Sequence, residues 1–173
     1  MTRKAPISGG VRRAAAVVVL LCALALGAPG VGEPDRPEST ALGVIRAIQS
    51  GELAYAAING GYYDTLECVA GPSCVPGVRS ARAFVDPDLA AARERRGYRF
   101  EFHAGPAPAP GSDERRSRSA VTRFAVVAIP LAAQAAEHRA FCGDDTGAIY
   151  FTRVGTVPRV EGGRCLDTAG RIR

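Results

Sequence analysis

A chain of 173 residues has room for one domain and an additional segment. Its formal charge of +5 is concentrated at the start, because four of the 22 cations lie within the first thirteen residues and all 17 acids follow residue 32. The 18 cations and 17 acids that remain give the body a net charge of +1. Nucleic-acid partners require concentrated positive charge, so this balance argues against them.

The first 30 residues have the build of a secretory signal peptide. A basic stretch precedes 15 uncharged residues, "AAAVVVLLCALALGA", and small residues follow. This apolar run is shorter than the roughly 20 residues that a helix needs to cross a bilayer. We therefore expect residues 1–30 to be a signal peptide, or a short N-terminal anchor, and the rest to be periplasmic or extracellular. Membrane contact is expected only if this segment stays uncleaved.

The expected export bears on the state of the cysteines. Cys22 lies inside the expected signal and would be discarded with it, which leaves Cys68, Cys74, Cys142 and Cys165. An even number in an exported chain predicts two disulfides, and four cysteines allow three pairings. Cys68 and Cys74 flank the turn-rich loop "VAGPS" and can meet without help from distant structure; Cys142 and Cys165 would then close a larger loop. Neither spacing is typical of a zinc site, and we expect no metal or other cofactor.

One long helix is expected near the start of the body. Residues 31–38 carry prolines, glycines and acids, which predicts a linker before a globular domain over residues 39–173. Over about residues 40–58, apolar residues recur at spacings of three and four, with one miss at Glu52. The glycines that follow supply a stop signal. This pattern predicts an amphipathic helix.

A short second helix is expected further along. Residues 60–85 look irregular. Asp86 is then a favourable N-cap, and Gly97 suits a left-handed helix end. The cations of segment 93–96 would lie in the last turn, where they favour the helix dipole.

Four strands are expected after this helix. The clearest covers residues 98–103, where apolar and polar side chains alternate strictly and so lie on opposite faces. The others are short apolar or β-branched runs at residues 123–131, 138–142 and 148–152. The Pro-rich, charged stretch 105–119 is expected to be a mobile connection, and the tail after residue 152 to be irregular except where Cys165 pins it.

The candidate site residues lie in the stretch "FCGDDTGAIYF", residues 141–151. Asp144 and Asp145 stand between two apolar runs and beside glycines, which predicts a hairpin loop. The alternatives are a carboxylate pair for acid–base chemistry, with His103 or His138 as partner, and a calcium site. Catalysis needs a partner group and a pocket, and calcium needs six or more oxygens. Neither histidine has an acid or nucleophile at motif spacing, so both are expected at the surface.

Three stretches, taken in order, resemble type IV pilins and type II secretion pseudopilins. The first is "ESTALGVIRAIQSGELAYAAINGGYYDTLECV", similar to the second half of the family's long helix and the Gly-Tyr turn after it. The second, "VDPDLAAARERRGYRFEF", looks like the short helix and first strand, and the third, "RAFCGDDTGAIYF", like the final hairpin. Together they cover about residues 38–152.

The resemblance implies a fold and a role. The fold would be α+β: an N-terminal amphipathic helix packed on a four-stranded antiparallel sheet, with a C-terminal loop clasped by a disulfide, here Cys142 to Cys165. The role would be that of an exported, non-enzymatic structural or interaction domain associated with a type IV pilus or type II secretion machinery, with protein partners that contact the lateral surface of helix 40–58. The alternatives are a periplasmic hydrolase that uses Asp144 or Asp145 with a histidine, and a calcium-stabilised binding module, since C-terminal loops of pseudopilins can hold that ion.

The N-terminus departs from the family. Its members start with a short basic leader, a Gly or Ala cleavage site, a Phe, and a Glu at the fifth mature position, followed by about twenty apolar residues. Here Arg12-Arg13 stand where apolar residues are expected, no Glu precedes Glu33, and three prolines between residues 29 and 37 interrupt any continuous helix. We therefore expect a soluble pilin-like domain that does not polymerise in the conventional way.

Overall fold

The computed structural model describes residues 37–78, 82–91, 93–111, 115–133 and 135–172. The expected signal, residues 1–30, lies outside them, as does the linker except for Pro37 and Glu38. These two residues form the first turn of the main helix and are not part of a linker. Proline is favoured at the first helical position, and an acid is favoured near the positive end of the helix.

Helix α2 spans Pro37–Ala56 and so begins three residues before the expected start. Its apolar stripe is buried as predicted, through Ala41, Val44, Ile45, Ile48 and Tyr55. Gly60 and Gly61 then take positive φ angles, and the backbone N–H of Gly61 donates to the carbonyl of Ala56 at 2.9 Å, which closes the helix end. Across the described ranges, no helix is long and apolar enough to cross a membrane.

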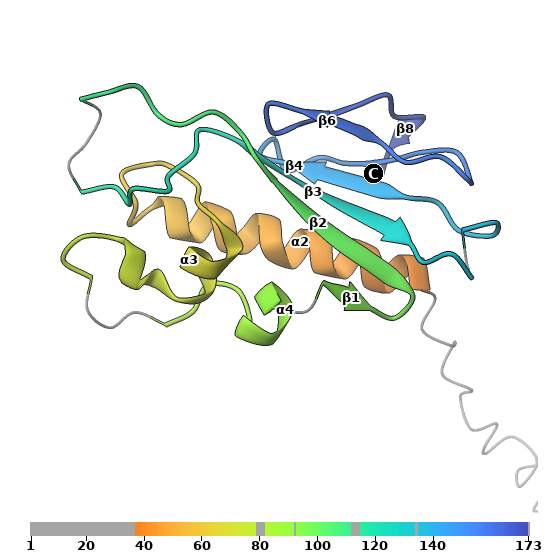
Figure 1. Ribbon diagram of the computed structural model, residues 1–173, viewed down its shortest axis with the longest axis horizontal. Helices are drawn as coiled ribbons and strands as arrows, with labels where there is room; N and C mark the ends of the chain where they lie inside the picture. Colours follow the sequence, from red (N-terminus) through yellow and green to blue (C-terminus); the bar gives the residue numbers. More distant parts are fainter. Residues whose placement is uncertain (1–36, 79–81, 92, 112–114, 134, 173) are drawn as a thin grey trace, which may run out of the picture. The chain divides into compact units, whose positions relative to one another are not determined.

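Helix α2 lies across one face of an antiparallel sheet (Figure 1). The strand order is β1-β2-β3-β4-β5-β8, and every neighbouring pair is antiparallel. The strands are β1 Glu94–Arg95, β2 Tyr98–Ala104, β3 Phe124–Pro130, β4 Phe141–Asp144, β5 Ile149–Phe151 and β8 Gly170–Arg171. The expected α+β class, with one main helix on an antiparallel sheet, is confirmed.

The expected number of four strands is wrong. Strands β2 to β5 correspond to the four that the sequence predicts, but the sheet has six strands. The additional ones, β1 and β8, are two residues long and lie at the two edges. Strands this short carry no periodic pattern, because alternation needs about four residues to be recognised.

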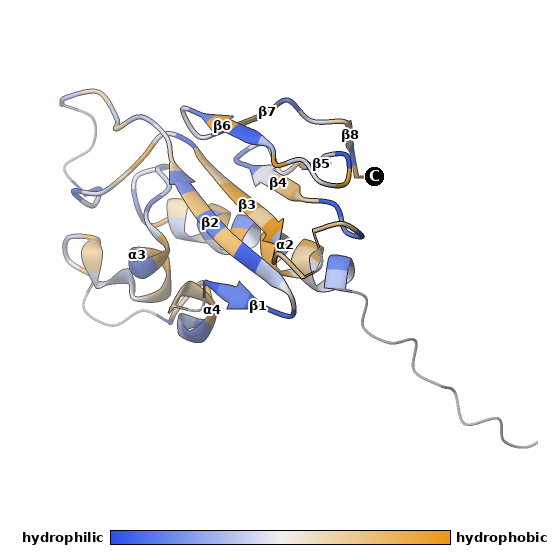
Figure 2. Cartoon of the chain, turned by 45° about the vertical axis from the view of Figure 1, so that its right-hand side comes forward, coloured by the Kyte–Doolittle hydropathy of each residue, from blue (hydrophilic) through white to orange (hydrophobic). Residues whose placement is uncertain are grey.

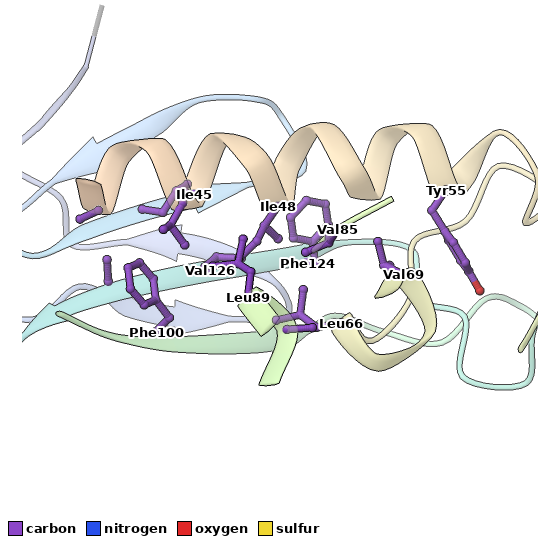
Figure 3. Close-up of a cluster of buried hydrophobic side chains, with 14 of the residues drawn as sticks. Ile45, Ile48, Tyr55, Leu66, Val69, Val85, Leu89, Phe100, Phe124 and Val126 are labelled. Carbon is purple, nitrogen blue, oxygen red and sulfur yellow. The ribbon is translucent and has the colours of Figure 1, made fainter. Parts of the chain in front are cut away.

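The main core lies between α2 and the sheet (Figure 3). Strand β2 alternates as predicted, with Tyr98 and Phe100 buried toward the helix and Arg99 exposed. Strand β3 is apolar along most of its length (Figure 2) and is buried on both faces. A strand with this composition needs cover on its second face as well.

A hairpin of β6 (Arg159–Glu161) and β7 (Arg164–Leu166) supplies that cover. Its Val160 and Cys165 pack on the second face of the sheet, against Ala125, Val127 and Cys142. The expectation of an irregular C-terminal tail is therefore wrong. Tight-turn glycines at 162 and 163, both at positive φ, and the tie through Cys165 hold together two strands that have little apolar pattern of their own.

Residues 60–85 are also more regular than expected within the part of them that the structure describes. They contain helix α3 (Leu66–Ala70) and a 3-10 turn η1 (Pro72–Cys74). The Thr65 side chain caps α3 by accepting a hydrogen bond from the backbone N–H of Cys68. A helix of five residues is too short to give a periodic signal in the sequence.

Helix α4 (Pro87–Ala91) starts where the sequence predicts, after Asp86, whose carboxylate accepts from the backbone N–H of Asp88 at 2.8 Å. Segment 93–96 does not form its last turn, which corrects the sequence prediction. Part of this segment forms β1, and Arg96 and Gly97, both at positive φ, turn the chain directly into β2. Two such residues give the hairpin turn whose twist suits antiparallel strands.

Candidate functional site

Asp144 and Asp145 lie at the hairpin between β4 and β5, as the sequence predicts. One carboxylate oxygen of Asp144, Oδ1, accepts from both the backbone N–H and the hydroxyl of Thr146. Gly147 takes a φ of 74°, and its N–H donates to the Asp144 carbonyl at 3.0 Å. Asp144 therefore stabilises the turn by the local hydrogen bonds for which turns favour Asp.

The two neighbouring carboxylates have different surroundings. Asp144 Oδ2 accepts from the backbone N–H of Cys165 at 3.5 Å, so Asp144 also links the turn to β7. Asp145 Oδ2 lies 3.7 Å from Nη2 of Arg164, while its Oδ1 is enclosed and receives no hydrogen bond within the described ranges. Burial raises the pKa of Asp145; the charge of Arg164 opposes this shift and the charge of Asp144 adds to it.

The structure does not bring these carboxylates together with a histidine. His103 pairs with Glu101, at 3.7 Å, on the half-buried part of β2. In the sheet register His103 and Asp144 both stand opposite Ala125, on strands two apart. Their backbones are thus separated by about 10 Å, twice the strand spacing of roughly 4.8 Å. His138 lies near the start of α2, 4.0 Å from Glu38.

A cavity of about 150 Å³ lies beside this turn, against the C-terminal half of α2. Its apolar lining comes from Leu53, Tyr63 and Phe124, and its polar lining from Gln49 and residues 144–147. The rings of Tyr63 and Phe124 meet edge to face, 4.9 Å apart. Gln49 holds the turn to the helix by donating to two of its carbonyls, at 2.9 and 3.0 Å.

No group of three or more metal-ligating side chains comes together in the part of the chain that the structure describes. The calcium site considered for the turn would need further oxygen ligands around Asp144 and Asp145. Their neighbours include instead Arg164, which is a cation, and backbone N–H groups, which are donors and do not bind a cation.

The exposed face of α2 is uncharged over its second half. From Ala47 to Ala54 the sequence holds one charged residue, Glu52, and this residue is buried. The exposed side chains are Ala47, Ser50, Leu53 and Ala54. Leu53 is 67% exposed, and it also lines the cavity. Four exposed positions of α2 thus carry no charge, next to the exposed Arg46.

Sequence reasoning missed a buried polar cluster at the C-terminal end of α2. Asp64 accepts hydrogen bonds from the hydroxyls of Tyr55, at 2.8 Å, and Ser117. Ser117 also donates its backbone N–H to Asn59 at 2.7 Å. Ser117 is fully buried, although it lies in a stretch that was expected to be mobile. These bonds explain the difference, because a polar segment is held in the interior when its groups are paired there.

Glu52 is the most unusual member of this cluster. Its Oε2 accepts from the backbone N–H of Asp64 at 3.1 Å, and its Oε1 is buried without a hydrogen bond from the described residues. Burial raises the pKa of Glu52 to about 8, and the nearby charge of Asp64 adds to the shift. Glu52 is therefore mostly protonated at neutral pH. The sequence does contain a sign of this burial, because Glu52 is the one acid within the otherwise apolar stripe of the helix.

Both disulfides form in the expected pairing. Cys68 is bonded to Cys74, across a sequence separation of 6, and Cys142 to Cys165, across a separation of 23. The first joins α3 to η1, and the second joins the central strand β4 to β7. Two such bonds indicate an oxidising, exported environment, since cytosolic thiols are kept reduced.

Comparisons of the chain with protein-family models, with curated proteins and with solved structures found no match. The resemblance to type IV pilins and pseudopilins therefore rests on the three stretches of sequence quoted for it.

Proposed function

We propose that this chain is an exported, non-enzymatic domain that acts by contacting other proteins, with components of a type IV pilus or type II secretion machinery as its partners. One observation carries the proposal. A long helix is followed by an antiparallel sheet and then by a C-terminal segment tied to β4 through Cys142–Cys165. The resemblance to pilins and pseudopilins implies this order of elements.

The proposed contact surface is the uncharged face of α2. Most of the opposite side of this helix is used by the core, so the outward face is the part available to a partner. Depletion of charge at the centre of a contact and an exposed large apolar residue are features of protein interfaces. Leu53 supplies the apolar residue. This surface is also the lateral helix surface that the resemblance implies.

The proposal includes export and excludes conventional polymerisation. The two disulfides support the first part. The second part rests on the sequence, in which prolines separate the apolar run from α2. N-terminal sequencing of the exported protein tests both, because a freed domain would begin shortly after residue 27 or residue 30, the two plausible cleavage positions.

Site-specific photo-cross-linking in intact cells tests the partner. A photoreactive amino acid is placed at Ala47, on the uncharged face, and in a matched control at Asp88, an exposed residue of α4. We expect adducts from position 47 that contain a pilus or secretion component, identified by mass spectrometry, and fewer such adducts from position 88. Adducts without any such component, or equal yields from both positions, would refute the proposal.

A further inference from the structure

The cavity beside α2 has the size of one side chain. Pockets that bury drug-sized molecules hold roughly 300–1,000 Å³, whereas this cavity holds about 150 Å³. An apolar cavity of about that volume is large enough for a benzene molecule. The occupant that fits is therefore a small molecule or a single side chain that reaches in from a partner.

Asp145 lines the cavity, and its carboxylate presents one oxygen to it at most. The side chain is 14% exposed. Oδ1 is enclosed and receives no hydrogen bond from the described residues, so a ligand in the cavity would have to contact Oδ2. The distance of 3.7 Å from Oδ2 to Arg164 is too long for a hydrogen bond. The raised pKa of Asp145 agrees with incomplete compensation of its charge.

The other walls favour a cation on an aliphatic stem. The rings of Tyr63 and Phe124 line the cavity, and aromatic faces attract cations that approach within about 6 Å. Leu53 at the rim offers apolar contact for methylene groups. A lysine ammonium is a compact point charge with three donors on a flexible stem of four carbons.

We propose that this cavity binds a primary ammonium group, presented by a lysine side chain of a protein partner that packs along the uncharged face of α2. Leu53 belongs both to that face and to the cavity rim, so a partner segment on the face passes over the cavity. The identity of the partner rests on the function proposed above. The preference for an ammonium group is a property of the cavity alone.

The test uses the purified protein and two small probes. N-acetyl-lysine methylamide carries the ammonium group, and N-acetyl-norleucine methylamide has the same stem without it. Each is titrated into ¹⁵N-labelled protein and followed by the backbone amide shifts. We expect the lysine probe to shift the amides of Tyr63 and residues 145–147, and the norleucine probe to bind at least tenfold more weakly.

Variants identify the groups involved. Asp145→Asn is expected to weaken the lysine probe at least tenfold, while Asp88→Asn, at an exposed carboxylate of α4, leaves its binding unchanged. Leu53→Arg places a cation at the rim, on a side chain that is 67% exposed and contributes little to the fold, and is expected to weaken binding as well. Arg164→Gln removes the guanidinium that competes for Asp145 and is expected to strengthen binding several-fold.

The outcomes separate the two proposals. Equal binding of the two probes, or unchanged binding in folded Asp145→Asn and Leu53→Arg proteins, overturns the cavity proposal, as does an affinity that does not rise in Arg164→Gln. Lysine-probe binding without cross-links from Ala47 to a pilus or secretion component overturns the proposed function and leaves the cavity preference intact.

Discussion

Arg139 fastens the first turn of α2 to the sheet by holding both carboxylate oxygens of Glu38, 101 residues earlier in the chain. Its Nη2 donates to Oε2 at 2.7 Å, and its backbone N–H donates to Oε1 at 3.0 Å. The guanidinium also lies over the rings of Phe141 and Phe151, with its carbon 5.6 and 5.0 Å from the ring centres. The Arg139 side chain thus joins the start of α2 to β4, which contains Phe141, and to β5, which contains Phe151.

Replacing this arginine should cost more than removing an ordinary surface charge. We expect Arg139→Ala to lower the free energy of unfolding by about 1–2 kcal/mol, because charge-assisted hydrogen bonds and ring contacts are lost; partial exposure of the pair keeps the value from being larger. Arg99→Ala is the matched control, since it breaks an exposed pair with Glu101 and should change stability by less than about 0.5 kcal/mol. Urea unfolding measures both, and equal losses would contradict the role given to Arg139.

The buried Glu52 should make the stability of the domain depend on pH. Its pKa is about 8 in the folded state, against an ordinary value of 4.5. Between these values the unfolded chain has released the proton and the folded chain still holds it, so the free energy of unfolding falls as pH rises, by up to about 1.4 kcal/mol per unit. Above pH 8 this contribution levels off. Asp64, Tyr55 and Tyr63 are the titratable groups around Glu52.

A glutamine at this position removes the titration and nearly keeps the shape. We expect Glu52→Gln to flatten the stability profile between pH 5 and 8, measured by denaturant unfolding at each pH. Glu67→Gln, which changes an exposed acid of α3, should leave the slope as in the unmodified protein. Parallel profiles for Glu52→Gln and the unmodified protein would show that Glu52 is not protonated in the folded state.

The two disulfides should contribute unequally. In the chain-entropy model a disulfide with a sequence separation of 23 stabilises by about 3.4 kcal/mol and one with a separation of 6 by about 2.2 kcal/mol. We expect the Cys142→Ser, Cys165→Ser double variant to lose more stability than the Cys68→Ser, Cys74→Ser one, also because the first releases β7 from the sheet. Denaturant midpoints of the two double variants decide the order, and a larger loss for the shorter loop would reverse our interpretation.

Close approach of α2 to the sheet depends on the absence of a side chain at Gly143. A Cβ there would lie 2.3 Å from Cγ2 of Ile45 and 2.9 Å from Nε2 of Gln49. We expect Gly143→Ala to destabilise the domain by about 1–3 kcal/mol through overpacking. Gly43→Ala, on the open side of the same helix with nothing within 4 Å, should instead stabilise it by about 0.5–1 kcal/mol. Thermal unfolding of the two variants should move in opposite directions, and shifts of the same sign would contradict this packing.

The elements that could be predicted were those with local patterns. The spacing of Ile45 and Ile48 identified α2, and the alternation from Tyr98 identified β2, because in both cases one buried face imposes its period on the sequence. Asp144 and Gly147 likewise identified the turn from local chemistry alone. The close spacing of Cys68 and Cys74 identified one disulfide and, by subtraction, the other.

The features that were missed depend on distant partners. Strands β6 and β7 have only three residues each. Their place on the sheet is set by the Cys142–Cys165 disulfide and by the hydrogen bond from the backbone N–H of Cys165 to the Asp144 carboxylate. Ser117 is buried because Asn59 and Asp64 receive its hydrogen bonds from more than fifty residues away. The cavity likewise combines α2, β3 and the turn after β4. No short stretch of the sequence contains all the residues that form one of these features.

Strand β4 is enclosed on every side: α2 and β7 cover its faces, and β3 and β5 pair with its edges. Its backbone amides should therefore exchange with solvent deuterium only when the whole domain opens, whereas those of the outermost strands β1 and β8 exchange through local fraying. Reducing Cys142–Cys165 would expose one face of β4 without separating it from its neighbours in the sheet. Partial opening of this protein would thus begin at the two edges of the sheet, and β3, β4 and β5 would stay protected under α2.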